Sequence, residues 1–160
     1  MRKKLILIFA IVSLFSLFVE IIKAEEIMVP ASAFNPYSQD NLYQRNFLRI
    51  YSDWGSPEEA FFAPVYLPQG KRVHKVIIYY YDLGSENIAV RLYRTNMYTY
   101  SANMMVQVTS KGDSGNGSNS SYSISTPVIN NSGYGYSLKI YFPVGGGSIY
   151  RIYGVKIVLK

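Results

Sequence analysis

The fold of this chain is decided at Val73–Asp82, which reads VHKVIIYYYD, and at Ile88–Arg94, which reads IAVRLYR. Both runs are rich in β-branched and aromatic residues, which favour the pleated, half-buried surface of a sheet. The residues between them include Gly, Ser and Asn, so Asp82–Asn87 is predicted to form a hairpin loop. The centre of the first run, Val76–Tyr81, does not alternate between apolar and polar residues. We therefore expect a strand that is central in its sheet or buried on both faces.

Short apolar runs bounded by Gly, Pro, Asn, Asp or Ser recur along the rest of the chain. Several alternate with period 2, which places one face of a strand in the core and the other in solvent or against a partner. In one of them, Met104, Val106 and Val108 are expected to share a face. The Gly-, Ser- and Asn-rich stretch Ser110–Ser121 predicts a loop. The predicted strands are Glu26–Val29, Phe47–Tyr51, Ala60–Tyr66, Val73–Asp82, Ile88–Arg94, Met104–Thr109, Tyr122–Ser125, Tyr134–Phe142 and Ile149–Leu159.

The number of these runs predicts the fold class. No stretch after Val19 shows a 3.6-residue period, so we expect an all-β protein with eight or nine strands. Two antiparallel sheets packed as a jelly-roll-like β-sandwich fit this pattern, with an immunoglobulin-like sandwich as the alternative. The only tryptophan, Trp54, lies in a loop-like context without the Cys–Trp–Cys spacing of immunoglobulin domains.

The first residues of the chain predict secretion. Met1–Lys4 is positively charged, Leu5–Val19 is an uncharged apolar run, and Ala24 offers a small residue for cleavage before Glu25. The run is shorter than the about 20 residues that a membrane-spanning helix needs. Residues 1–24 are therefore predicted to be a signal peptide and residues 25–160 a single β-sandwich domain. We expect the mature protein to be secreted, extracellular or at the cell surface, without a permanent membrane anchor.

Charge and cysteine content narrow the function classes. The net charge of +6 falls to +3 without the predicted signal, which contains four of the sixteen basic residues and one of the ten acidic ones. The remaining basic residues cluster only at Lys71, Arg72 and Lys75, so binding of nucleic acid is not expected. The absence of cysteine excludes thiol catalysis, cysteine-based metal sites and a lipid anchor on a cysteine.

Five motifs of the chain resemble those of a group of uncharacterised secreted prokaryotic proteins. In that group a signal peptide precedes a Pro-Ala/Gly-Ser-Ala-Phe segment, a Phe-x-Ala-Pro-Val-x-Leu-Pro-x-Gly strand and turn, and further strands rich in Tyr, Arg and Val. The resemblance implies one jelly-roll-like β-sandwich domain, and no activity is known for the group. The matching segments here are Val29–Phe34, Phe62–Gly70, Tyr79–Asp82, Val90–Arg94 and Tyr153–Ile157.

Groups that would support catalysis are scarce in this sequence. His74 is the only histidine, and a solvent-facing position in a strand is its simplest interpretation. A general base there would need a nucleophile and an orienting acid, and no Gly-x-Ser-x-Gly motif occurs. A pair of carboxylates would suffice for a glycosidase, but acids are few and no supporting cleft residues are recognisable. We therefore predict a non-enzymatic protein.

Two acidic residues flank the predicted loop after the first run. Asp82 and Glu86 could supply oxygen ligands to a structural Ca²⁺, although no 12-residue calcium-loop pattern is present. The alternative is that Asp82 caps a turn and that Glu86 is solvated. No other cofactor is expected.

Tyrosine is the strongest compositional signal. The chain has sixteen tyrosines, all of them after residue 24, and they exceed what a core of this size can hold. Some must reach the surface, where an apolar ring with a polar tip suits contact with sugars and with other proteins. The surface aromatic candidates are Trp54, Tyr79, Tyr81, Tyr93, Tyr98, Tyr100 and Tyr141.

The segment after the predicted cleavage site has apolar residues at period 2, namely Ile27, Val29, Ala31 and Ala33. It could be the first strand of its own domain, or it could leave that domain and complete the sheet of a neighbouring copy. Pro30 removes one backbone donor, which favours an edge strand. Donation from copy to copy would polymerise the protein head to tail.

These observations support two functions. The main prediction is a secreted structural subunit that self-assembles into an extracellular filament, tube or oligomer through exchange of the N-terminal strand. The alternative is a carbohydrate-binding module that uses surface Tyr and Trp side chains to bind extracellular glycans.

Overall fold

The computed structural model describes residues 24–36, 43–45, 49–52, 60–112, 115–144 and 147–160. Within them the chain forms two sheets. Sheet A contains β1 (Glu25–Pro30), β3 (Tyr43–Arg45), β4 (Ile50–Ser52), β6 (Val73–Asp82), β9 (Gly115–Ser121) and β11 (Tyr150–Leu159). Sheet B contains β2 (Asn35–Pro36), β5 (Ala60–Val65), β7 (Ala89–Asn96), β8 (Ala102–Thr109) and β10 (Tyr134–Tyr141). Two short 3-10 helices, η1 (Ala31–Ala33) and η2 (Gly147–Ile149), lie between strands.

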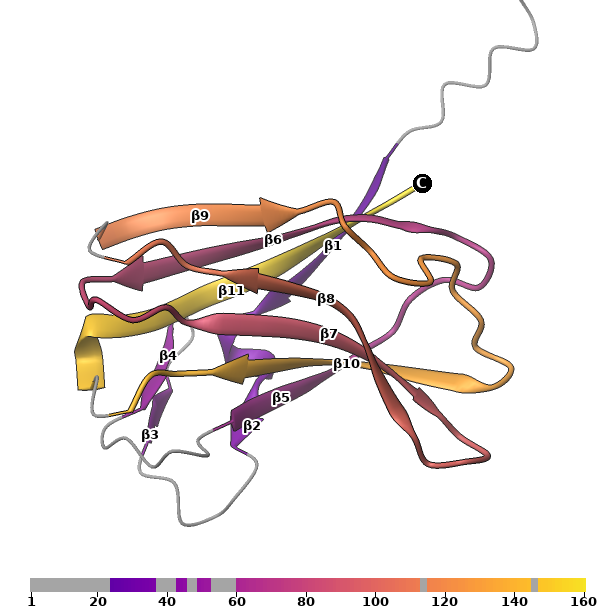
Figure 1. Ribbon diagram of the computed structural model, residues 1–160, viewed down its shortest axis with the longest axis horizontal. Coiled ribbons are helices and arrows are strands. Elements are labelled where there is room, and N and C mark those ends of the chain that lie inside the picture. The colour runs from indigo at the N-terminus through magenta and orange to yellow at the C-terminus, as the bar shows by residue number, and fades with distance from the viewer. Residues whose placement is uncertain (1–23, 37–42, 46–48, 53–59, 113–114, 145–146) are drawn as a thin grey trace, which may run out of the picture.

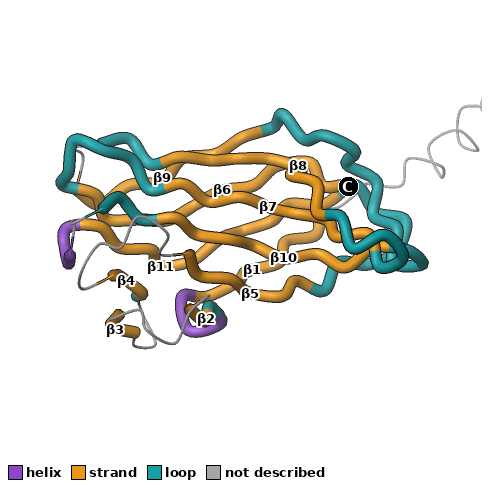
Figure 2. Tube along the Cα trace, turned by 60° about the horizontal axis from the view of Figure 1, so that its bottom comes forward, coloured by secondary structure: helices purple, strands orange, loops and turns teal. Residues whose placement is uncertain are grey.

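The two sheets pack face to face as a sandwich (Figures 1 and 2). Sheet A has the order β3-β4-β11-β6-β9, with β1 also pairing with β11, and sheet B has the order β2-β5-β10-β7-β8. Every strand pair within the described residues is antiparallel. The predicted all-β, jelly-roll-like antiparallel sandwich is therefore confirmed. The expected eight or nine strands are too few, because the described residues form eleven, several of them short.

The core lies between the sheets and follows the alternation of the strands. On β10, near the middle of sheet B, Leu138 and Ile140 are buried while their neighbours are half-buried. On β11, Val155, Ile157 and Leu159 point inward, as their alternation in the sequence predicts. Burial of each such side chain contributes about 1.5–3 kcal/mol, so these rows hold the two sheets together.

The connection after β6 is not the hairpin that the sequence predicts. Asp82–Asn87 joins β6 of sheet A to β7 of sheet B, so the strands on either side of it lie in different layers. The hairpin is formed one connection later, where β7 turns into β8. Turn-forming residues mark the place where a strand ends, but they do not determine whether the next strand pairs with it or crosses to the other sheet.

The region between β8 and β10 also differs from the prediction. Ser110–Ser121, predicted as a loop, contains β9, and Tyr122–Ser125, predicted as a strand, is not one. β9 pairs with β6, which satisfies its backbone groups despite the low β propensity of Gly, Ser and Asn. Gly117 lies opposite Tyr80, and a Cβ there would lie 2.9 Å from the Tyr80 hydroxyl oxygen. The small residue therefore leaves room for that buried ring.

The strand β6 lies between β11 and β9, which confirms the prediction of a central strand. It is not buried on both faces. Val76, Ile78 and Tyr80 are buried, whereas Ile77 and Tyr79 are half-buried on the outer side. The sequence of Val76–Tyr81 does not alternate because apolar and aromatic residues also cover the outer face of this strand.

A β-bulge reverses the expected orientation of Met104. Leu92 on β7 pairs with Val106, but Tyr93 pairs with Met104, so Met105 is an extra residue in β8. Met105 is buried and Met104 is 49% exposed, whereas the alternation places Met104 on the same face as Val106. An inserted residue shifts the alternation beyond it, which a regular period of 2 cannot show.

The N-terminal segment pairs with β11 of its own chain. β1 runs antiparallel to β11 along its whole length (Figure 1). Val29 and Ala31 are buried, and Ile27 and Ala33 are partly buried against the core. The first of the two interpretations, a strand of the protein's own sheet, is thus the arrangement in this structure. Exchange of this strand between copies stays a prediction.

Two sequence predictions fall outside the described residues, and the predicted strand Phe47–Tyr51 lies partly outside them, with β4 at Ile50–Ser52 as its described part. Residues 1–23 contain nearly all of the predicted signal peptide, so secretion stays a prediction. Trp54 also lies outside them. Among the residues that the structure does describe, no helix has the length and apolar character needed to cross a membrane.

Gly84, in the connection between the sheets, lies against the buried ring of Tyr150. A Cβ at Gly84 would lie 1.8 Å from the Tyr150 hydroxyl oxygen, and Tyr150 is only 5% exposed. We expect Gly84→Ala to lower the free energy of unfolding by about 2 kcal/mol, because overpacking forces the ring or the loop to move. Urea unfolding followed by tyrosine fluorescence measures the effect. Ser85→Ala, at an exposed neighbour, is the control, and equal stability of the two variants would contradict the proposed crowding.

Candidate functional site

The outer face of sheet B gathers aromatic and hydrogen-bonding side chains. They alternate with the core residues of β5, β10, β7 and β8, so they point away from sheet A. We call this set the sheet B face. Its members are Phe62, Pro64 and Tyr66 on and just after β5, Ser137, Lys139 and Tyr141 on β10, Arg91 and Tyr93 on β7, and Met104 and Gln107 on β8.

Strand register aligns these side chains in rows across the sheet. Phe62 pairs with Lys139, Lys139 pairs with Arg91, and Arg91 pairs with Gln107. Directly paired residues on one face lie close enough for their side chains to interact. The row therefore places two cations and an amide beside an aromatic ring. The next row contains Pro64, Ser137, Tyr93 and Met104.

Arg91 is held in place at the centre of the sheet B face. Its Nε donates to Oε1 of Gln107 at 2.7 Å, and its guanidinium carbon lies 4.4 Å from the centroid of the Tyr141 ring. Beside it, the Lys139 Nζ lies 5.6 Å from the centroid of the Tyr93 ring. A guanidinium has five N–H donors, so Arg91 can contact a ligand while it keeps its contact with Gln107.

The side chains of Tyr93, Tyr141 and Arg91 lie close enough to shift one another's pKa values. Burial by itself would raise the pKa of Tyr93, but hydrogen bonds with Tyr141 and Arg91 outweigh it and hold that pKa below its usual value. Burial, followed by the hydrogen bond with Tyr93, raises the pKa of Tyr141. The hydrogen bond with Tyr93 also raises the pKa of Arg91, so this part of the face keeps a positive charge.

A cavity of about 530 Å³ hollows one end of the sheet B face. Tyr66, Asn131, Tyr134 and Gly135 are among the residues that line it. Gly135 contributes no side chain to the cavity, and Tyr66 at its rim is 89% exposed. Aromatic rings beside amide and backbone groups can bind a small ring that has one apolar face and polar edges.

The structure places the predicted surface tyrosines of the strands on two opposite faces. Tyr93 and Tyr141 belong to the sheet B face, where they contact the two cations. Tyr79 and Tyr81 lie on the outer face of sheet A, and the Arg151 guanidinium lies over the Tyr81 ring at 4.5 Å. Each face therefore has an arginine stacked on a tyrosine.

The remaining predicted tyrosines lie in a turn. Tyr98 and Tyr100 are both exposed between β7 and β8, outside the sheet B face. The Tyr98 hydroxyl donates to the carbonyl oxygen of Ser132 at 3.2 Å, which ties this turn to the connection before β10.

Sequence reasoning missed the polar members of the sheet B face. Arg91, Lys139 and Gln107 each appear in the sequence as one polar residue between apolar ones. Alternation shows that they point outward, but only the order β10-β7-β8 brings the three side by side. The available signal was the shared spacing, because Arg91 and Lys139 each precede a tyrosine of the same face by two residues.

The predicted calcium ligands have different surroundings. Asp82 is fully buried, its Oδ1 accepts the Gly84 N–H at 3.0 Å, and its Oδ2 accepts the Ser110 hydroxyl. Glu86 is exposed. Among the described residues, no group of three or more His, Asp or Glu side chains could hold a metal ion. The geometry of Asp82 fits the alternative interpretation of a turn cap, and bound calcium stays a prediction.

Comparison with known proteins shows the fold. No family model matches the chain, and no curated protein matches it either. Among solved structures, the CBM36-1 domain of a multidomain xylanase from the hindgut metagenome of Trinervitermes trinervoides is similar, with a TM-score of 0.50 and 12% identity over 83% of this chain and 96% of that one. The xylan-binding module CBM15 is similar with a TM-score of 0.51 and 10% identity, over 86% and 97% of the two chains.

At these identities the likeness shows the fold alone, a two-sheet β-sandwich. The β-sandwich implied by the resemblance to uncharacterised secreted proteins is confirmed in this way. The membership of that group is not supported, because no sequence match accompanies the structural one.

Proposed function

We propose that this protein is an extracellular, non-catalytic carbohydrate-binding module that binds a glycan on the sheet B face. One observation carries the proposal: Arg91, Gln107 and Lys139 lie among aromatic and apolar side chains on a single face of the sandwich. The two similar structures are by their names a xylan-binding module and a domain of a xylanase. Their shared fold supports carbohydrate binding over the self-assembling subunit, which no comparison supports.

The proposed mode of binding follows from the two parts of the face. A sugar ring packs its C–H side on Tyr66 at the cavity and, further along the strands, on Phe62. Its hydroxyl groups accept hydrogen bonds from Arg91 and Lys139. Because Gln107 and Tyr141 already hold the guanidinium, little side-chain freedom is lost when the glycan binds.

Removing Arg91 tests the proposal. We expect isothermal titration of the chain from residue 25 with oligosaccharides from xylan, mannan and mixed-linkage glucan to show binding of at least one of them. Arg91→Ala should weaken that binding about tenfold or more, since a lost charge-assisted hydrogen bond costs about 1.5–3 kcal/mol.

Arg151→Ala is the matched control for this experiment. Arg151 lies over the Tyr81 ring on sheet A as Arg91 lies over the Tyr141 ring on sheet B. The two variants therefore remove the same charge and the same kind of stacking contact from opposite faces. An equal loss of binding in both would contradict a site on the sheet B face, and silence of the native chain toward all three oligosaccharide classes would contradict glycan binding of this kind.

A further inference from the structure

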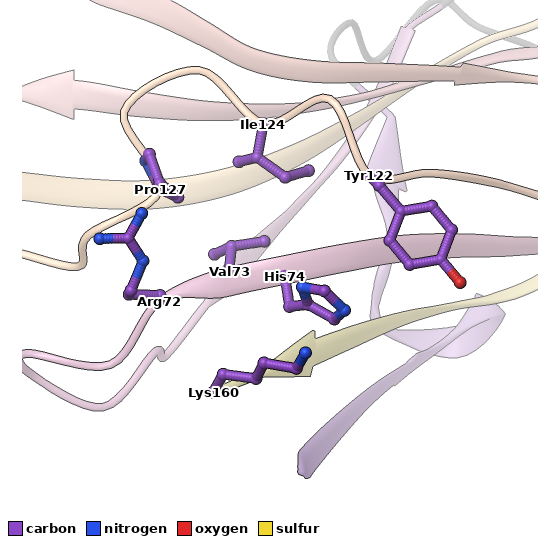
Figure 3. A pocket seen from close by; sticks show the side chains of 7 residues that line it. All are labelled: Arg72, Val73, His74, Tyr122, Ile124, Pro127 and Lys160. Atoms are coloured by element: carbon purple, nitrogen blue, oxygen red, sulfur yellow. The ribbon is translucent and has the colours of Figure 1, made fainter.

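A second cavity, of about 300 Å³, lies on sheet A where β6 begins and β11 ends. Arg72, His74 and Lys160 supply its cationic and titratable side chains, and Tyr122 supplies an aromatic wall. The backbones of Arg72 and Lys160 hydrogen-bond to each other in both directions, at 2.8 and 2.9 Å. The two residues are therefore held side by side. Figure 3 shows the His74 ring between the Tyr122 ring and the Lys160 side chain, with Arg72 toward Pro127.

The cationic side chains of this cavity form no ion pair with the described acidic side chains. Their acidic side chains are Glu25, Glu26, Asp82 and Glu86. Glu26 pairs with Lys156, and Asp82 is buried against Gly84 and Ser110. No ion pair joins a described carboxylate to Arg72, His74 or Lys160. A guanidinium and an ammonium group that line one small cavity favour an oxyanion, because charge-assisted hydrogen bonds are about twice as strong as neutral ones.

The other walls of the cavity suit a small ring with an apolar side. Tyr122 is 60% exposed and meets the His74 ring edge-on, with 5.4 Å between the ring centroids. The Lys75 Nζ lies 4.8 Å from the Tyr122 centroid, which helps to hold that ring against β6. Ile124 and Pro127 complete the apolar part of the lining. The volume lies at the lower end of the range for small-molecule sites, so it suits one ring rather than a chain of rings.

We propose that this cavity binds a single acidic sugar residue, with its carboxylate or sulfate group at Arg72 and Lys160 and its ring against Tyr122. The inference rests on the proposed function only for the saccharide nature of the ligand, because the site is separate from the sheet B face. An acidic glycan would thus bind at two places. The sheet B face would contact its neutral rings, and the cavity on sheet A would bind a negatively charged group.

Proton NMR of the chain from residue 25 tests this site directly. His74 is the only histidine, so its imidazole protons give one distinct set of signals. We titrate with glucuronate, a sugar sulfate, glucose and inorganic sulfate, at constant pH and ionic strength. The His74 signals should shift to saturation with glucuronate or with the sugar sulfate. Glucose should leave them unmoved, and inorganic sulfate should bind about tenfold more weakly because it lacks the ring.

Charge variants separate specific binding from general attraction. Arg72→Gln and Lys160→Gln change exposed side chains and should each raise the dissociation constant about tenfold. Lys71→Gln removes the same charge one residue away, outside the cavity, and should change it less than about twofold, because an exposed charge is screened by salt.

Three outcomes would overturn the proposal. They are unmoved His74 signals with both acidic sugars, equal affinity for inorganic sulfate, and an equal loss in Lys71→Gln and Arg72→Gln. The same experiments distinguish failure of this cavity from failure of the glycan site proposed on the sheet B face. Neutral oligosaccharides that bind and are weakened by Arg91→Ala, together with silence of His74 toward acidic sugars, would leave that site intact and remove only this one. Shifts of the His74 signals with acidic sugars, without any binding of neutral oligosaccharides, would support the cavity on sheet A and contradict the site on the sheet B face.

Discussion

Replacing Asp82 with alanine is expected to lower the free energy of unfolding by about 3 kcal/mol. Asp82 is fully buried at the end of β6 and accepts hydrogen bonds from the Gly84 N–H and the Ser110 hydroxyl. The Ser110 oxygen in turn accepts the Ile88 N–H at 2.7 Å. The carboxylate thus joins the end of β6 to the start of β7 and the end of β8. Alanine would leave two buried donors without an acceptor, and each such hydrogen bond to a charged group is worth about 1.5–3 kcal/mol.

Urea unfolding of Asp82→Ala and Asp82→Asn measures this effect and separates its causes. The asparagine variant keeps one oxygen acceptor for the Gly84 N–H, so we expect it to lose only about 1 kcal/mol. Native-like stability of Asp82→Ala would contradict a structural role for the carboxylate.

The same unfolding curves test whether calcium binds at Asp82 and Glu86. Because both oxygens of Asp82 already accept hydrogen bonds, we expect equal midpoints in Ca²⁺ and in a chelator. A higher midpoint in Ca²⁺ that is lost in Glu86→Gln would support the predicted calcium ligands.

The fold was predictable from the sequence wherever a long strand has one regular core face. The predicted bounds of Val73–Asp82 equal those of β6, and Ile149–Leu159 differs from β11 by one residue. In such strands burial repeats every two residues, and the apolar pattern of the sequence records that burial directly. The class of fold follows from the number of these strands and the absence of a helical period.

The predictions failed where structure depends on a neighbour distant in the sequence. The residues of Asp82–Asn87 favour a turn, yet the buried carboxylate of Asp82 and the close contact of Gly84 with Tyr150 make it a crossing between sheets. β9 has few good strand formers and exists because β6 offers an edge to pair with. The bulge at Met105 arises from its pairing with β7. A single-sequence pattern does not contain these partners.

The candidate site was predictable in its residue type but not in its place. The excess of tyrosine predicts surface rings, and Tyr93 and Tyr141 do lie on the sheet B face. The cations and the amide of the proposed glycan site come from three strands that are neighbours in sheet B, although β10 is separated from β7 and β8 in the sequence. The cationic cavity on sheet A depends on the approach of residues 72 and 160, which only the sheet brings together.

Deleting Glu25–Ala33 is expected to have the largest effect, a loss of about 4 kcal/mol in the free energy of unfolding. The deletion removes Val29 and Ala31 from the core and the whole ladder between β1 and β11. A buried aliphatic side chain contributes about 1.5–3 kcal/mol and each ladder hydrogen bond about 0.5–1.5 kcal/mol. The conformational entropy of the ordered segment offsets part of that sum. Urea unfolding of the chain from residue 25 and of the chain that lacks residues 25–33 measures this loss of stability.

A control must keep the strand while changing its outer face. Glu26→Gln with Met28→Ser does so, because Met28 is 52% exposed and Glu26 forms a surface ion pair with Lys156 at 2.8 Å. We expect this variant to unfold at nearly the same urea midpoint as the native chain, because surface ion pairs contribute little to stability. Equal stability of the native and truncated chains would contradict the contribution of β1 to this sheet.

The chain that lacks residues 25–33 also tests whether the protein self-assembles through exchange of β1 or keeps β1 in its own sheet. Because β1 already pairs with β11 of its own chain, we expect the chain from residue 25 to stay monomeric as its concentration rises, by light scattering. A synthetic peptide of residues 25–33 should restore stability to the truncated chain, since β11 then regains its ladder partner. Filaments or defined oligomers of the chain from residue 25 that disappear when residues 25–33 are removed would instead show that Ile27, Val29, Ala31 and Ala33 are exchanged between copies. In that case β1 would pair with β11 of its own chain in the monomer and with β11 of a neighbouring copy in the assembly.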